Sequence, residues 1–208
     1  MNLDTIRNFE WYNEPEFSLN SGMLVIKASS ATDFWQDKHN NIKKDDGHFF
    51  FIKHSGDFEL TVKWQKPEKI QELCQFGLLG RIDEQNWCKI SAMQIQKEMF
   101  LFLSVTYFGV SDSVIVPLTL NFNTISYRLY YNKGVFSLSY SLDGQQFKAI
   151  RHFQMFQDFD NIDIGAYICN PNTIEPISNI SYNMEKNGIS NKLNSFQCEL
   201  LDIDINHF

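Results

Sequence analysis

An indole ring and two basic side chains lie close together on two neighbouring predicted strands. Arg81 lies near the end of segment 75–83, and Trp87 and Lys89 lie near the start of segment 86–93. Strands joined by so short a turn pair antiparallel, and alternation puts these three side chains opposite the apolar ones. Indole rings stack on sugars, and basic groups donate to hydroxyls or carboxylates. We therefore expect an open platform for a ligand with hydroxyls or negative charge.

The segment 125–131 adds two side chains to this predicted platform. Arg128 and Tyr130 alternate there with Ile125, Tyr127 and Leu129. The same residue types also occur on ordinary solvated sheet faces, where the stems of Lys and Arg cover aromatic rings. That alternative remains open from the sequence.

Three residues outside these strands are further candidates for ligand contact. Trp35 offers a second ring, and Asp112 offers acceptor oxygens. His48 precedes three phenylalanines and could donate a hydrogen bond, although a lone histidine at the entry of a strand is more often structural. The predicted ligand-binding residues are Trp35, His48, Arg81, Trp87, Lys89 and Asp112.

Residue patterns for catalysis or metal binding are not found. No cluster of His, Cys and carboxylates has ligand spacing, so we predict neither a metal site nor a cofactor. A glycoside hydrolase needs two facing carboxylates, but the chain lacks the Glu-x-Asp-x-x-Glu pattern of lectin-fold glucanases. Asp202 and Asp204 alternate with apolar residues and are interpreted as the solvent-exposed side of an edge strand. We expect a protein without catalytic residues.

Strict alternation indicates the elements that must position these residues. In the segment 58–65, Phe58, Leu60, Val62 and Trp64 alternate with polar residues, so we expect the apolar set to be buried and Glu59, Thr61 and Lys63 to be exposed. Similar segments recur along the chain, and nineteen Phe and eight Tyr favour sheets. The expected fold class is all-β, an antiparallel two-sheet sandwich.

The ends of the chain are expected to complete this sandwich. The segment 9–19 contains Pro15 and predicts a first edge strand, since proline cannot donate to a ladder. The segment 196–205 predicts a closing strand that pairs with the N-terminal edge. Between them, residues 173–194 lack alternation and predict a long loop insertion. We expect residues 1–208 to form a single domain.

Composition limits the partners and the location of the protein. The formal net charge of −7 without a basic stripe argues against nucleic acid. No run of about 18 apolar residues is present, so no membrane partner is expected. The four cysteines are far apart and no signal segment precedes them, so we expect free thiols in the cytoplasm.

Several short motifs follow one another in a characteristic order. They are DFWQ at 33–36, DGHFFF at 46–51, GDFELTV at 56–62, FGLLGRID at 76–83, NWCK at 86–89, SD at 111–112, YSLDG at 140–144 and IGAY at 164–167. This order resembles the domain-of-unknown-function family that includes the regulation-of-enolase protein, within the concanavalin A-like lectin/glucanase superfamily. The resemblance implies a concanavalin A-like jelly roll. The family usually has a tryptophan where Ser113 stands, so altered ligand specificity is expected.

Three hypotheses for function follow. The first is a non-catalytic module that binds a carbohydrate or a small polar ligand on a concave polar-aromatic face. The second is a protein-interaction or regulatory domain acting on a metabolic enzyme, as the family name implies, with a flat exposed apolar patch. The third is an unrecognised glycoside hydrolase with a convergent carboxylate pair. The sequence favours the first and leaves the ligand and the oligomeric state open.

Overall fold

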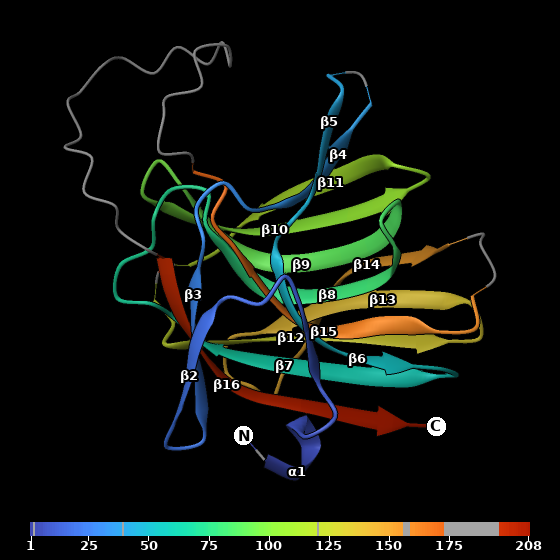
Figure 1. Ribbon diagram of the computed structural model, residues 1–208, viewed down its shortest axis with the longest axis horizontal. Helices are drawn as coiled ribbons and strands as arrows, with labels where there is room; N and C mark the ends of the chain where they lie inside the picture. Colours follow the sequence, from blue (N-terminus) through green and yellow to red (C-terminus); the bar gives the residue numbers. More distant parts are fainter. Residues whose placement is uncertain (2, 39, 120, 156–158, 173–195) are drawn as a thin grey trace.

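The computed structural model describes residues 1, 3–38, 40–119, 121–155, 159–172 and 196–208. These residues form two seven-stranded antiparallel sheets that enclose one large apolar core (Figure 1). The predicted all-β sandwich is thereby confirmed. The predicted insertion at 173–194 lies outside the described residues.

Each sheet combines strands from distant parts of the sequence. Sheet A contains, in spatial order, β1 (Glu10–Tyr12), β6 (His48–His54), β15 (Ile162–Cys169), β8 (Gln75–Asp83), β9 (Asn86–Ile95), β10 (Glu98–Tyr107) and β11 (Val110–Pro117). Sheet B contains β14 (Lys148–Gln154), β13 (Val135–Ser141), β12 (Thr124–Asn132), β7 (Phe58–Gln65), β16 (Phe196–His207), β3 (Met23–Ala28) and β2 (Glu16–Asn20). The short helix α1 (Leu3–Ile6) precedes β1.

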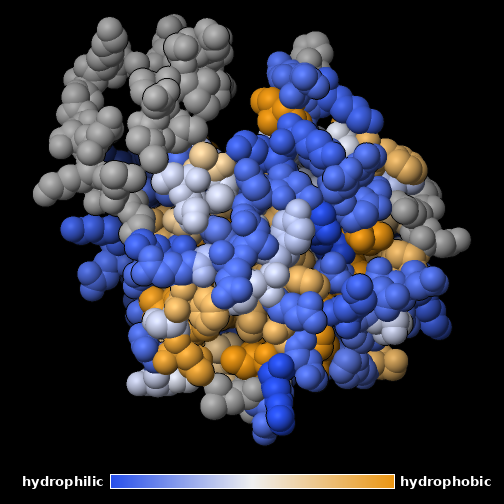
Figure 2. Space-filling view, viewed as in Figure 1, coloured by the Kyte–Doolittle hydropathy of each residue, from blue (hydrophilic) through white to orange (hydrophobic). Residues whose placement is uncertain are grey.

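A separate two-stranded hairpin consists of β4 (Phe34–Asp37) and β5 (Ile42–Asp45). Figure 1 shows its tip projecting beyond the strands of the sandwich. Figure 2, in the same orientation, shows hydrophilic residues over most of this face and hydrophobic residues gathered in its lower half.

The alternation of β7 is the clearest link between sequence and core. Its four apolar residues have no exposed surface, and the polar residues between them are half-buried. The indole Nε1 of Trp64 donates to the carbonyl oxygen of Gly77 at 3.0 Å, which joins the two sheets across the core. The predicted burial of the apolar set is confirmed, whereas Glu59, Thr61 and Lys63 are half-buried and not exposed as expected.

Sheet A is packed on both faces. A second apolar cluster lies on its outer face and contains Phe34, Phe49, Leu79, Trp87, Tyr167 and Cys169. On β6, Phe49 belongs to this outer cluster whereas Phe50 belongs to the core between the sheets. The run of mostly apolar residues at 48–52 is explained by the burial of β6 on both faces of sheet A.

The terminal segments differ in part from expectation. The closing strand β16 pairs with β3 and β7 and not with the segment 9–19, so the expected pairing with the N-terminal edge strand is wrong. The segment 9–19, expected to be one strand, is two: β1 joins sheet A and β2 joins sheet B. Pro15 lies between them, where no ladder hydrogen bond is required of its nitrogen.

Two further expectations concern the surroundings of the protein. The four cysteines are all unbridged, as predicted. Burial raises the pKa of the Cys74 and Cys88 thiols to about 12. Among the residues that the structure describes, no helix has the length and apolar character needed to cross a bilayer.

Candidate functional site

The base of the β4–β5 hairpin covers the outer face of sheet A. Phe34 is fully buried there, with ring centroids 6.0 to 6.5 Å from those of Phe49, Trp87 and Tyr167. Gly47 closes the hairpin, and a Cβ at this position would lie 2.4 Å from the Phe34 ring. Gly47 is not among the residues with positive φ, so no left-handed backbone conformation requires a glycine there. Its small size is what the packing requires.

Lys89 lies under this hairpin with no exposed surface. Its ammonium group donates to Asp33 Oδ1 at 3.2 Å, to the Phe34 carbonyl oxygen at 2.6 Å and to Gln75 Oε1 at 3.0 Å. The rings of Trp87, Phe102 and Tyr167 lie 5.2 to 5.6 Å from it. All three ammonium donors therefore have internal acceptors. We call Lys89, Asp33, Gln75 and these three rings the buried lysine cluster.

Arg81 holds the second strand of the hairpin at the same base, where Asp45 lies opposite Phe34. Its guanidinium binds Asp45 through two nitrogens, at 2.7 and 3.3 Å, and lies 4.8 Å from the centre of the Tyr12 ring. The Tyr12 hydroxyl donates to the same carboxylate at 3.0 Å. Burial, followed by the charge of Asp45, raises the pKa of Tyr12. The two ion pairs, Lys89 to Asp33 and Arg81 to Asp45, fasten the hairpin to sheet A.

The predicted open platform is therefore wrong in one respect. Arg81, Trp87 and Lys89 share the outer face of sheet A, as alternation indicated, but the hairpin closes that face and Trp87 and Lys89 are fully buried. Trp35 is part of the cover, because its half-buried ring lies 6.2 Å from that of Phe102.

The expected companions of the platform lie elsewhere. Arg128 and Tyr130 are on β12, which belongs to sheet B, so the sandwich separates them from Trp87. Asp112 lies on the edge strand β11 and pairs with Arg151 of β14 at 2.5 Å. This ion pair links the edges of the two sheets and leaves Asp112 away from the buried lysine cluster.

His48 is buried and has structural partners. Its Nε2 accepts from the Ser29 amide at 2.9 Å, and its Nδ1 lies 2.5 Å from the Asn13 carbonyl oxygen. These contacts fit a neutral ring whose Nδ1 carries the proton. Burial lowers the pKa of His48, although the bond to Asn13 and the charge of Asp46 oppose this.

The lowered pKa of His48 predicts a loss of stability in acid. A folded-state pKa below the unfolded value of about 6.5 contributes stability above that pH, and the contribution is lost as pH falls through the folded-state pKa. We expect the free energy of unfolding, measured with urea, to fall more between pH 7.5 and pH 5 in the natural protein than in H48N. The exposed His152 supplies the control, since H152N should keep the natural slope. Equal slopes in all three proteins would refute this role.

An open hollow of about 360 Å³ lies on the outer face of sheet B. We call it the sheet B groove. It is lined by outward side chains of β7, β12 and β16 and by the turn after β13: Glu59, Thr61, Lys63, Ser126, Arg128, Gly144, Phe147, Asp202, Asp204 and Asn206. Period-2 alternation produces this lining, because the opposite sides of the same strands fill the core.

Arg128 is at the centre of the groove's contacts. Its guanidinium carbon lies 3.7 Å from the centre of the Phe147 ring, and its Nε lies 3.5 Å from Glu59 Oε1 and 3.4 Å from Thr61 Oγ1. Phe147 is positioned by the preceding turn, where Asp143 accepts from the amides of Gln146 and Gln145. Hydrogen bonds lower the pKa of Asp143 to about 2. They come from the Gln146 amide, the Ser141 hydroxyl and the Gln145 amide.

The groove presents acceptors and donors side by side, with an aromatic ring at one wall. Asp202 and Asp204 point to solvent, and Asp202 is 55% exposed. Hydroxyl groups both donate and accept, so a polyol can use carboxylates and a guanidinium together. Sequence reasoning identified the wet character of Asp202 and Asp204 but did not connect them with Arg128. Among the described residues no cluster of three or more metal-ligating side chains occurs.

Comparison with known proteins shows one family and one fold. The family model described as "Protein of unknown function (DUF1349)" matches residues 11–200. A relative from Saccharomyces cerevisiae, "Regulation of enolase protein 1", is 26% identical over 163 residues, which cover 77% of this chain and 80% of the relative.

Solved structures share the sandwich. A functionally unknown protein from Saccharomyces cerevisiae superposes with a TM-score of 0.80 at 19% identity, covering 97% of both chains. The GH43B protein of a Bacteroides ovatus xyloglucan locus gives 0.68 at 12% identity, covering all of this chain and 37% of that one. A xylan beta-1,4-xylosidase from Bacillus halodurans gives 0.62 at 9% identity, covering 96% and 39%. At these identities the likeness concerns the fold alone.

Proposed function

Because the chain belongs to the DUF1349 family and has a two-sheet β-sandwich fold, we propose that it is a non-catalytic module that binds a carbohydrate or a similar small polar ligand in the sheet B groove. The observation that carries the proposal is the groove itself, an open polar hollow of about 360 Å³. Sites for small molecules are concave and contain a few convergent polar groups.

The buried lysine cluster is the competing location for a ligand, and its geometry favours a structural role. Its ammonium has three internal acceptors, and the hairpin above it is held by a buried phenylalanine and two ion pairs. A ligand would have to displace Phe34, at a cost of about 3 kcal/mol or more for the exposed ring alone. The sheet B groove needs no such opening.

The non-catalytic part of the proposal rests on the surroundings of the acids. Retaining and inverting glycosidases use a protonated carboxyl group whose pKa is raised by apolar surroundings. Asp202 and Asp204 face solvent, and Glu59 lies beside the Arg128 guanidinium. None of the three has the buried apolar environment of a general acid.

Substitutions in the groove should weaken ligand binding without unfolding the protein. We expect R128Q and D204N each to lower affinity roughly tenfold to hundredfold, since hydrogen bonds to charged groups contribute about 1.5 to 3 kcal/mol. Calorimetry with oligomers of xylose, glucose, N-acetylglucosamine and mannose is the measurement.

The control for these substitutions is E16Q. Glu16 lies on the exposed edge strand β2, where it binds Lys27 of β3 at 2.7 Å, away from the groove. It should leave affinity unchanged. Two results would contradict the proposal. One is equal affinity in the natural protein, R128Q and D204N, and the other is no binding of any of the four kinds of oligosaccharide.

A regulatory protein-interaction domain is the second candidate function. The edge strand β11 exposes Val110, Val114 and Ile115, and Phe108 lies in the turn before it. The name of the yeast relative points the same way, to an effect on an enzyme. I115K should then abolish capture of a partner protein while leaving oligosaccharide affinity unchanged, whereas R128Q should do the reverse. For either function we propose a cytoplasmic location, where the four unbridged thiols would stay reduced.

A further inference from the structure

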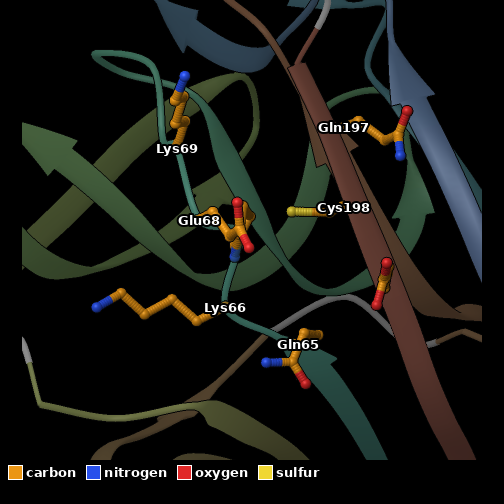
Figure 3. Close-up of a pocket in the computed structure, with 8 residues that line it drawn as sticks. Gln65, Lys66, Glu68, Lys69, Gln197 and Cys198 are labelled. Atoms are coloured by element: carbon orange, nitrogen blue, oxygen red, sulfur yellow. The ribbon is translucent and has the colours of Figure 1, made fainter.

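A second hollow of about 380 Å³ lies beyond the end of the sheet B groove. One side of this hollow is lined by Gln65 and by the connection after β7, residues 66–69. Residues 197–199 of β16 line the other side. Figure 3 shows these two groups, with the Cys198 side chain extending from β16 toward Glu68. The lining is polar apart from Pro67 and Cys198, and it resembles the groove in its mixture of carboxylates, lysines and amides.

The two hollows follow the same pair of strands: the groove lies on the outer face of sheet B, and the second hollow lies at the end of the sheet, where the connection after β7 begins. Lys63 of β7 lies opposite Asp202 of β16, and Gln65 lies opposite Glu199. Lys63 and Asp202 line the groove, whereas Gln65 and Glu199 line the second hollow. The hollows are therefore consecutive along β7 and β16.

A bulge in β16 keeps this face continuous. The register shifts between Leu200 and Asp202, so one extra residue lies between Glu199 and Asp202. In a regular strand two carboxylates three positions apart would point to opposite faces, but the bulge restores their common side. With it, both face outward, and Leu200 and Ile203 remain buried in the core.

Length and charge indicate what such a surface can hold. From Glu59 to Gln65 the outward residues span about 20 Å, several times the width of one sugar ring, at roughly 3.3 Å per residue. The described lining residues of both hollows comprise five carboxylates and four cationic side chains. A nearly balanced lining gives no net attraction to a polyanion or a polycation. An uncharged chain of hydroxyl-bearing units suits it better.

We infer that the two hollows form one extended site that binds a linear, uncharged oligosaccharide. Lys63 and Asp202, which lie opposite each other on β7 and β16, are near the middle of this site. The inference rests on the proposed function and specifies its ligand. A monosaccharide occupies the groove alone, whereas a chain of about four units reaches Gln65, Gln197 and Glu199.

The test is a chain-length series of one to six units of the same four sugars, titrated calorimetrically. Affinity is expected to rise at least tenfold between the disaccharide and the tetrasaccharide and then to level off. Q197A and E199Q should lower the affinity for the tetrasaccharide about fivefold or more and leave that for the disaccharide unchanged. E98Q, an exposed residue on β10 of sheet A, serves as the control and should change neither, whereas Glu16 binds Lys27, which lies opposite Gln197.

The outcomes separate this inference from the proposed function. Affinity that does not depend on length, with R128Q still weakening it, overturns the extended site and leaves the proposed function standing. Loss of tetrasaccharide affinity in E199Q together with an unchanged disaccharide supports the extended site. Absence of binding in all four series overturns both.

Discussion

Replacing Lys89 with methionine is expected to lower the free energy of unfolding by about 3 to 5 kcal/mol, the range for removing one partner of a buried ion pair. Methionine keeps most of the apolar stem but removes the three hydrogen bonds to Asp33, Phe34 and Gln75. The Asp33 carboxylate is then left under the hairpin without its cation. Urea unfolding monitored by fluorescence measures the change.

A second variant shows how much of this loss comes from the uncompensated charge. D33N in the K89M background removes the carboxylate, so the double variant should be more stable than the sum of the two single changes predicts. K27M, on the exposed pair with Glu16, is the control and should change stability by no more than about 1 kcal/mol. A loss in K89M as small as that in K27M would show that the ion pair does not hold the hairpin.

Truncating Phe34 to alanine is the other change with a large expected effect, about 3 to 5 kcal/mol. The ring has no exposed surface and lies within the second apolar cluster, so its removal leaves a cavity between hairpin and sheet. The matched control is Ile42, which is in the same hairpin but 41% exposed. I42A should cost about 0.5 kcal/mol or less.

Ligand affinity separates the structural account of this hairpin from a ligand-site account. F34A protein that is still folded at low temperature should bind oligosaccharides as the natural protein does, because the sheet B groove is untouched. If F34A raised affinity by uncovering Trp87 and Lys89, the hairpin would be a lid and the ligand site would lie on sheet A.

The sequence predicts which side of a strand a residue is on far better than what covers that side. Alternation correctly separated the two faces of β7, β8 and β9 because the side-chain period of a strand is two. It could not show that the base of the β4–β5 hairpin covers Trp87, since that contact is between distant segments. A signal was present, however: segment 86–93 has a single charged residue, which is typical of a strand buried on both faces.

Alternation also does not assign a strand to a sheet. The segment 125–131 has the same pattern as its neighbours in sequence, yet it pairs with β7 and β13 in sheet B. This pairing separated Arg128 from the predicted platform and placed it in the same groove as Asp202 and Asp204, with β7 between them. The bulge in β16 does have a signal in the sequence. The apolar residues that are buried stand at even positions up to Leu200, and the next one, Ile203, stands at an odd position.

The central claim is that ligand binds to sheet B and not under the hairpin. The most direct measurement is a ¹⁵N–¹H spectrum of the natural protein titrated with the tightest-binding tetrasaccharide of the four series. The account predicts shifts of the backbone amides of Thr61, Arg128 and Asp204 and no shift of the Trp87 indole, whose N–H has no hydrogen-bond partner among the described residues. A shift of the Trp87 indole with unchanged amides on β7, β12 and β16 would contradict it.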